Sequence, residues 1–195
     1  MKAKKQKNFD AELKVIARAR KGDEKALNEL ITIYKKDLFQ YCYYLTGNNS
    51  MAEDFLQETF IKAFKNLDKL QSDKAFKSWL HSIALHLYLD YRKPMKNQEH
   101  DSMENAPEVM VKSNKVELRD AINDVLEQLR DDEKECLLLV DLADNTYEET
   151  AKIMGISEDA VRWKIREARR KFISYMEENQ MDFTGIIHFG KKETA

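Results

Sequence analysis

The stretch YEETAKIMGISEDAVRWKIREARRKF, residues 147–172, carries the most specific local pattern of the chain. Two helices that cross closely need a small residue at the crossing, a glycine at the turn and an aliphatic anchor in the second helix. Ala151, Gly155 and Val161 supply these at offsets of four and six residues, and Ile156 follows the glycine at the corner. The stretch therefore predicts a helix-turn-helix, of the winged-helix-like kind, near the C-terminus.

The second helix of this motif has two unlike sides. Val161, Ile165, Ala168 and Phe172 recur at spacings of four, three and four, which is typical of the buried stripe of an amphipathic helix. The opposite side is predicted to expose one tryptophan and five cations: Arg162, Trp163, Lys164, Arg166, Arg169 and Arg170. A recognition helix has this form, because side chains near its N-terminus reach base edges while further cations hold phosphates. A solvated basic helix in a bundle is the other interpretation.

The composition favours helices over a turn-rich β fold. Of 195 residues only 5 are Gly and 2 are Pro, while 43% are hydrophobic and 35% are charged. No apolar run approaches the roughly 20 residues that span a bilayer, and the basic N-terminus lacks the apolar segment of a secretory signal. Cys42 and Cys136 lie in apolar helical patterns and are expected to be reduced core thiols. We expect an all-α protein of the cytoplasm, without membrane insertion.

Helical periodicity divides the chain into two regions. Apolar residues recur at intervals of three and four over 23–46, 50–67 and 76–92, and Pro94 is expected to end the last of these helices. A polar, aperiodic stretch follows before the periodicity resumes near Val116. We predict two small helical domains and a flexible linker: domain 1–93, linker 94–115, domain 116–178 and a tail 179–195.

The helix expected over 50–67 carries an acidic side. Ser50 followed by Glu53 indicates a capping box at its start. Helical geometry then places four polar residues on one side, next to an apolar one: Glu53, Asp54, Gln57, Glu58 and Ile61. Such a stripe suits a basic, partly apolar helical partner and repels DNA phosphate. An ordinary solvated helix face is the simpler interpretation.

Four segments between about Gly22 and Phe172 resemble one protein family in their order and spacing. They are GDEKALNELITIYKKDLFQYCYYLTGN, AEDFLQETFIKAF, FKSWLHSIALHLYLDYRK and the helix-turn-helix stretch. Together they resemble bacterial sigma factors of the extracytoplasmic-function group of the sigma-70 family. The resemblance implies a region 2-like domain for the minus-ten promoter element and a region 4-like domain for the minus-thirty-five element. It implies an alternative sigma factor that binds core RNA polymerase and directs promoter recognition and transcription initiation.

The resemblance also implies three sets of contact residues. The acidic stripe of 50–67 would dock on the clamp helices of the largest polymerase subunit. The loop and helix that follow would capture bases of the opened non-template strand: Lys74, Phe76, Lys77, His86, Asp90, Arg92 and Lys93. The last helix would read the minus-thirty-five element: Arg162, Trp163, Lys164, Arg166, Glu167, Arg169 and Arg170.

Some of these positions depart from the family pattern. His86 stands where the family usually has Asn, Trp163 replaces a small residue and Glu167 replaces an Arg. Arg pairs with guanine and Glu accepts from cytosine, so the altered set is expected to change the preferred sequence rather than abolish binding. Trp79 shares a stripe with Ile83 and is expected to be a core residue rather than a base-stacking platform.

The motifs of the sequence and the family resemblance together give expectations for function and partners. No nucleophile–base pair, metal-ligand cluster or phosphate-binding glycine loop is visible, so we expect neither an enzyme nor a cofactor or bound metal. The implied partners are core RNA polymerase and promoter DNA, often with control by an anti-sigma factor, and the free protein is expected to be a monomer. The main alternative is a stand-alone helix-turn-helix transcription regulator with an N-terminal ligand-binding or dimerisation domain. A protein-binding helical adaptor is a third candidate.

Overall fold

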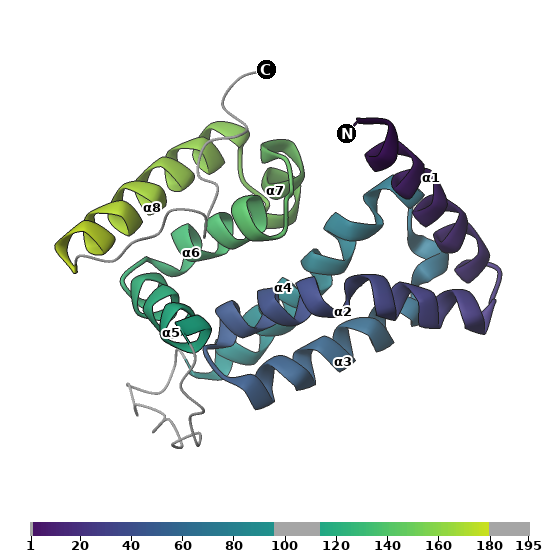
Figure 1. The fold of residues 1–195 in the computed structure, drawn as a ribbon, viewed down its shortest axis with the longest axis horizontal. Helices are drawn as coiled ribbons and strands as arrows, with labels where there is room; N and C mark the ends of the chain where they lie inside the picture. Colours follow the sequence, from purple (N-terminus) through teal and green to yellow (C-terminus); the bar gives the residue numbers. More distant parts are fainter. Residues whose placement is uncertain (1, 96–113, 180–195) are drawn as a thin grey trace. The chain divides into compact units, whose positions relative to one another are not determined.

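The computed structural model describes residues 2–95 and 114–179, and the chain divides into two compact units, Met1–Gln98 and Glu99–Ala195 (Figure 1). The described residues form helices with short connections and contain no β-strand. The all-α fold of two helical domains is confirmed, but no wing of β-strands accompanies the helix-turn-helix in these residues. Most of the predicted linker 94–115 and all but the first residue of the tail 179–195 lie outside the described residues.

The N-terminal unit consists of α1 (Lys2–Ala19), α2 (Glu24–Thr46), α3 (Asn49–Lys65), two 3₁₀ turns (Leu67–Lys69 and Asp73–Ala75) and α4 (Phe76–Met95). α2 starts as predicted because the Asp23 carboxylate accepts hydrogen bonds from two backbone N–H groups of the first turn, at 2.9 and 3.3 Å. It ends at Gly47, whose φ of 68° is left-handed. α4 continues through Pro94 for one more residue.

The start of α3 differs from the prediction. Asn48 is its N-cap, and the Asn48 Oδ1 atom accepts a hydrogen bond from the Met51 N–H at 3.0 Å. The capping box predicted for Ser50 and Glu53 is therefore wrong, because the Asn48 side chain already satisfies a free N–H of the first turn. This leaves the carboxylate of Glu53 for the exposed side of the helix.

α1 is a helix that periodicity alone does not predict, since its dense cations obscure a narrow apolar side. Ile16 is completely buried, and α1 packs against α2 and against the 3₁₀ turn before α4. Just after α1, Arg20 Nη1 bonds to Asp73 Oδ1 at 2.9 Å. The Tyr34 hydroxyl of α2 donates to the Glu12 carboxylate of α1. α1 thus fastens the loop between α3 and α4 to the rest of the unit.

A buried histidine lies in the core between α2 and α4. His81 is 1% exposed, and its ring stands edge-on to Tyr41 with the centroids 4.9 Å apart. A carbonyl oxygen can only accept, so the 2.8 Å contact to the Lys77 carbonyl places the proton on Nδ1. Nε2 is buried without a hydrogen-bond partner in the described residues. Burial lowers the pKa of His81 to about 4, and the ring is neutral at pH 7.

Replacing His81 with Phe is expected to remove a pH dependence of stability. The unfolded ring binds a proton near pH 6.5 and the folded ring only near pH 4, so the free energy of unfolding falls as the pH falls through that window. Between pH 7 and 5 the wild type should lose about 2 kcal/mol relative to His81→Phe in denaturant unfolding. The exposed His86 is the matched control, because His86→Phe should keep the wild-type dependence. Identical pH profiles for wild type and His81→Phe would contradict a buried neutral ring.

The C-terminal unit consists of α5 (Asn114–Glu127), α6 (Asp131–Leu137), a π-helical turn (Leu138–Leu142), α7 (Tyr147–Met154) and α8 (Glu158–Glu178). The stripe predicted for the last helix forms its core, as Val161, Ile165, Ala168 and Phe172 are each at most 1% exposed. The Asn145 amide donates to the Leu139 carbonyl at 3.1 Å and closes the loop between the π-helical turn and α7.

Candidate functional site

The four polar residues and the isoleucine predicted for one side of α3 do share an exposed face. We call it the acidic face: Glu53, Asp54, Gln57, Glu58 and Ile61. The face points outward because Ala52, Phe60 and Ala63 on the other side are buried in the core. Rotating α3 would bring these apolar side chains into water. Core packing therefore fixes which carboxylates are presented.

The charges of the acidic face are only partly neutralised. Glu58 lies 4.0 Å from Lys62, one turn further along α3. Glu53 and Asp54 form no ion pair within residues 2–95 and 114–179. Ile61 is 45% exposed, so an apolar side chain continues the face beyond the carboxylates. A surface of this kind attracts cationic partners over a distance and offers an apolar contact once they dock.

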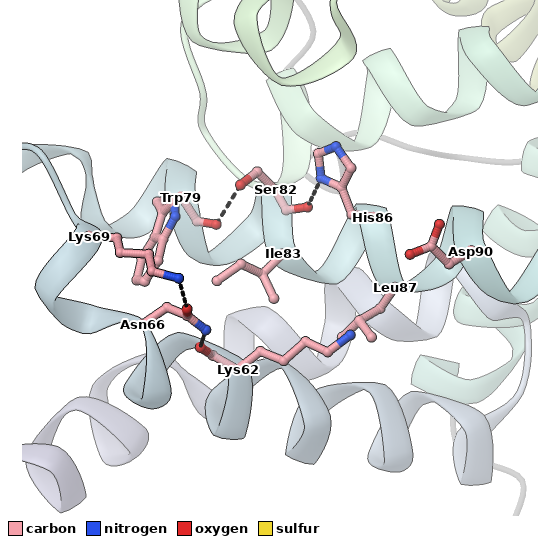
Figure 2. A pocket seen from close by; sticks show the side chains of 9 residues that line it. All are labelled: Lys62, Asn66, Lys69, Trp79, Ser82, Ile83, His86, Leu87 and Asp90. Carbon is pink, nitrogen blue, oxygen red and sulfur yellow. Dashed lines mark hydrogen bonds between the residues drawn. The ribbon is translucent and has the colours of Figure 1, made fainter.

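A groove of about 380 Å³ lies between α3, the loop after it and α4 (Figure 2). We call it the α4 groove, and its lining residues are Lys62, Asn66, Lys69, Trp79, Ser82, Ile83, His86, Leu87 and Asp90. Three of these are apolar and come from successive turns of α4, while two ammonium groups come from α3 and the loop. An apolar wall beside cations suits a flat ring linked to a phosphate, as in a single nucleic-acid strand.

Hydrogen bonds order the polar side of the groove (Figure 2). Lys69 Nζ donates to Asn66 Oδ1 at 2.7 Å, and the Asn66 amide nitrogen donates to the Lys62 carbonyl at 2.9 Å. On α4, the Nδ1 atom of His86 lies 2.6 Å from the Ser82 carbonyl and donates to it. The Nε2 atom of His86 is then an acceptor in the neutral ring.

Of the seven residues predicted for the minus-ten element, only His86 and Asp90 line the groove. The prediction for Phe76 is wrong, because its ring is completely buried, with ring centroids 5.3 Å from Tyr34 and 6.2 Å from Trp79. Phe76 begins α4 and anchors the helix to the core, so it offers no face to a base. Trp79, expected in the core, is instead half-buried and forms part of the groove wall.

The remaining cations of this set lie outside the groove lining. Lys74 is exposed on the 3₁₀ turn and Lys77 is half-buried in the first turn of α4. Lys93 bonds to Asp90 at 2.6 Å, and this bond lowers the pKa of Asp90. The Arg92 guanidinium lies 5.4 Å from the centre of the Tyr88 ring. Lys74 and Lys77 thus lie just before or at the start of α4, whereas Arg92 and Lys93 lie near its other end, so the four cations do not line one pocket.

The helix-turn-helix has the local geometry that the sequence predicts. Thr146 caps α7 and forms a reciprocal capping box with Glu149, with bonds of 2.8 and 3.1 Å. Gly155 follows α7 with a φ of 67°, where a β-carbon would be strained. The Ser157 hydroxyl then caps α8 by accepting from the Ala160 N–H at 3.2 Å. Two caps and one glycine thus fix where α8 begins.

The outward side of α8 is smaller than predicted. We call it the α8 face, and it contains Arg162, Trp163, Arg166, Glu167 and Arg170. Arg162 lies 3.7 Å from Glu158 and over the Tyr147 ring, 4.9 Å from its centre. Arg170 bonds to Glu167 at 2.9 Å, which lowers the pKa of Glu167 and keeps it ionised. Arg166 has no ion-pair partner in the described part of the chain.

Two cations predicted on this face are used inside the unit. The Arg169 guanidinium is about 10% exposed and forms two bonds, of 2.8 and 3.0 Å, to the Asp141 carboxylate of the π-helical turn. Lys164 is 14% exposed and pairs with Asp132 of α6. Burial tends to raise the pKa of Asp132, but Lys164 outweighs it and the pKa lies below its usual value. The prediction that Arg169 and Lys164 are exposed on the outer side of α8 is therefore wrong, because both attach α8 to the preceding elements.

Residues 2–95 and 114–179 contain neither a group of metal-ligating side chains nor a helix that could span a membrane. No three His, Cys, Asp or Glu side chains in these ranges are grouped to hold an ion, and none of the helices there is both long and apolar enough to cross a bilayer. Cys42 and Cys136 are both buried, and burial raises the pKa of each thiol to about 12. They are protonated at neutral pH.

Two helical units, the second a helix-turn-helix with a basic recognition helix, define a DNA-binding transcription factor. The family model described as Sigma-70 region 2 matches residues 30–94, and Sigma-70, region 4 matches residues 119–172. The ECF RNA polymerase sigma factor SigW of Bacillus subtilis (strain 168) is 30% identical over 178 residues, covering 81% of this chain and 94% of that protein.

Solved structures show the same fold. CnrH, in complex with the cytosolic domain of CnrY, has a TM-score of 0.68 at 22% identity and covers 87% of this chain and 99% of its own. RpoE of Bartonella quintana, in complex with the anti-sigma factor NepR, has a TM-score of 0.63 at 19% identity, with coverages of 78% and 98%. The chain belongs to the sigma-70 family, in the extracytoplasmic-function group. It is an alternative sigma factor that directs transcription initiation, and its family consists of non-enzymatic transcription factors.

Proposed function

We propose that this sigma factor binds core RNA polymerase through the acidic face and promoter DNA through the α4 groove and the α8 face. The acidic face is the observation that carries the proposal. Two carboxylates that form no ion pair within the described residues, followed by an exposed isoleucine, match a basic and partly apolar coiled coil such as the clamp helices of the largest polymerase subunit. A DNA duplex would be repelled by the same face.

Association with the enzyme is the first test. The full-length chain is mixed with bacterial core polymerase, and co-elution is followed by run-off transcription from a library of promoter fragments. A sigma factor co-elutes and starts transcription. A stand-alone regulator does neither, so failure of both assays would favour the repressor-like alternative. We place the free factor in the cytoplasm as a monomer, with an anti-sigma factor as a further partner.

The α4 groove holds a base of the opened non-template strand in this proposal. Trp79, Ile83 and Leu87 offer an apolar surface to the ring, and Lys62 and Lys69 lie close enough to attract the adjoining phosphates. A paired base inside a duplex does not expose its face, so occupation of the groove favours the open state. Opening then needs no hydrolysis, because base capture alone shifts the equilibrium.

Lys69→Glu is expected to reduce promoter opening without affecting assembly. Reversing one cation of the groove should lower the open fraction about threefold, because a phosphate contact is replaced by repulsion. Permanganate reactivity of thymines in the bubble measures opening, and co-elution measures assembly. Lys65→Glu is the control, since Lys65 is exposed on α3 but does not line the groove. Equal losses in both variants would show that general charge, rather than the groove, matters.

The α8 face reads the minus-thirty-five element in this proposal, and Glu167 sets part of its preference. Glu167→Arg is expected to change the preferred base at one position from cytosine to guanine, because a carboxylate accepts from the cytosine amino group whereas a guanidinium donates to guanine. Binding selections from randomised duplexes compare the two holoenzymes. An unchanged base preference would exclude Glu167 from base contact. Ser174→Ala, further along α8, is a control that should leave the preference unchanged.

A further inference from the structure

The α8 face contains a tryptophan that the fold does not require there. Trp163 is 47% exposed, more than any other large apolar side chain in the described part of the C-terminal unit. The core stripe of α8 is complete without it, since Val161 and Ile165 on either side are buried. The exposed part of the indole forgoes the stabilisation that burial of apolar surface gives. A bound partner would recover that stabilisation.

The indole is held in place from a different helix. The Arg130 guanidinium, at the start of α6, lies over the Trp163 ring at 5.5 Å from its centre. Arg130 is itself fixed by Glu133 at 3.2 Å and by Asp132 at 3.4 Å. Glu133 is buried and also bonds to Lys171 of α8 at 2.7 Å, which ties the start of α6 to the recognition helix. The Lys164 ammonium, which pairs with Asp132, also lies 5.8 Å from the centre of the ring. The tryptophan therefore has two cations of its own unit beside it, and about half of its surface is exposed.

The position of Trp163 determines what it can meet. It lies in the second turn of α8, and its exposed neighbours on the same side include Arg162, Arg166 and, one turn earlier, Asp159. Side chains near the start of a recognition helix meet base edges in the major groove. All four bases present polar groups there, and thymine is distinguished by its apolar C5-methyl group. An indole offers mainly apolar surface, and its best match among these edges is that methyl group.

We infer that Trp163 selects thymine in the minus-thirty-five element through its methyl group, and that Arg130 is a positioning residue that holds the indole for this contact. The inference rests on the proposed function of the α8 face and names the base that one of its residues selects. It makes the C5-methyl group, rather than a hydrogen bond, the recognised feature at that position.

Replacing thymine by uracil removes only the methyl group and provides the test. Duplexes are selected from a randomised library with the wild-type holoenzyme, and each thymine of the selected sequence is changed to uracil in turn. Losing one buried methyl group should weaken wild-type binding about fourfold at one position. Trp163→Ser holoenzyme should bind the thymine and uracil duplexes equally. Arg130→Gln should show a smaller preference for thymine than the wild type.

Lys152→Ala is the matched control for Arg130→Gln. Lys152 is an exposed cation of the same unit, on α7, and any phosphate contact it makes affects thymine and uracil duplexes alike. The Lys152→Ala holoenzyme should therefore show the same ratio of affinities for the thymine and uracil duplexes as the wild type. Wild-type indifference to uracil at every position, or an unchanged ratio in Trp163→Ser, would overturn the inference. If Lys152→Ala lowers the preference for thymine over uracil as much as Arg130→Gln does, Arg130 has no positioning role.

The same duplexes separate this inference from the proposed function. A holoenzyme that assembles and transcribes but ignores the methyl group leaves the proposed function intact and rejects the role of Trp163. Where the chain does not bind core polymerase, the proposed function fails. The uracil series on duplexes selected by the full-length chain alone then still decides whether Trp163 reads the methyl group.

Discussion

Glu53→Lys combined with Asp54→Lys is expected to weaken association with core RNA polymerase about 100-fold, because two attractive contacts to a basic partner become repulsive. Neither carboxylate has an ion-pair partner within residues 2–95 and 114–179, and both are exposed. The exchange therefore breaks no ion pair of the described residues, and the free energy of unfolding should stay close to that of the wild type. Titration of labelled core enzyme measures the affinity, and denaturant unfolding verifies the fold.

The matched control places the same change of net charge elsewhere. Glu177→Lys with Glu178→Lys alters two exposed carboxylates at the end of α8, in the other unit, and should leave core binding nearly unchanged. High salt should reduce the difference between wild type and the α3 variant, since screening weakens charge–charge contacts. Wild-type affinity in the α3 variant would place the polymerase contact on another surface.

Arg169→Ala is expected to destabilise the C-terminal unit by about 3–5 kcal/mol, because it leaves the carboxylate of Asp141 buried without its cation. Both side chains are about nine-tenths buried, and two short hydrogen bonds join them. Such a loss is a large part of the stability of a small domain. Thermal or denaturant unfolding of the full-length chain should show the C-terminal transition shifted while the N-terminal one stays in place.

Two further variants distinguish a buried ion pair from a general loss of charge. Arg170→Ala removes the neighbouring guanidinium, which is 65% exposed and, in the described part of the chain, bonds to Glu167 of its own helix; it should cost less than about 1 kcal/mol. The double variant Arg169→Met with Asp141→Leu removes both charges and should recover most of the stability lost in Arg169→Ala. A cost for Arg169→Ala no larger than that for Arg170→Ala would contradict the structural role.

The sequence predicts the helices of both units well, because their apolar periodicity and caps are local. The helix-turn-helix is confirmed down to the left-handed glycine and the buried stripe. The roles of individual cations were harder to predict. A helical wheel places Arg169 next to the buried stripe and Arg166 farther from it. The wheel does not reveal that Asp141, from a turn 28 residues earlier, is the partner of Arg169. Periodicity places a side chain on a helix and does not reveal its partner in another element.

The α4 groove illustrates the same limit. Helical spacing from His86 is enough to find Ser82, Ile83 and Asp90, which lie one turn away on the same helix. Lys62, Asn66 and Lys69 enter the groove only through the packing of α3 and its loop against α4. The sequence assigns Phe76 to the base-binding set wrongly, because an aromatic ring next to lysines is equally typical of a platform for a base and of a side chain that anchors a helix in the core. Only its burial decides between the two.

The internal pairing of the α8 face bears on how the factor searches the genome. Arg162 and Arg170 already have carboxylates of their own helix beside them, at 3.7 and 2.9 Å, whereas Arg166 has no ion-pair partner among residues 2–95 and 114–179. Chromosomal duplex that displaced those carboxylates would release few condensed counterions, so the entropy that drives nonspecific adsorption is small. The free factor is then not titrated away by the bulk of the chromosome, and it remains available to compete for the enzyme.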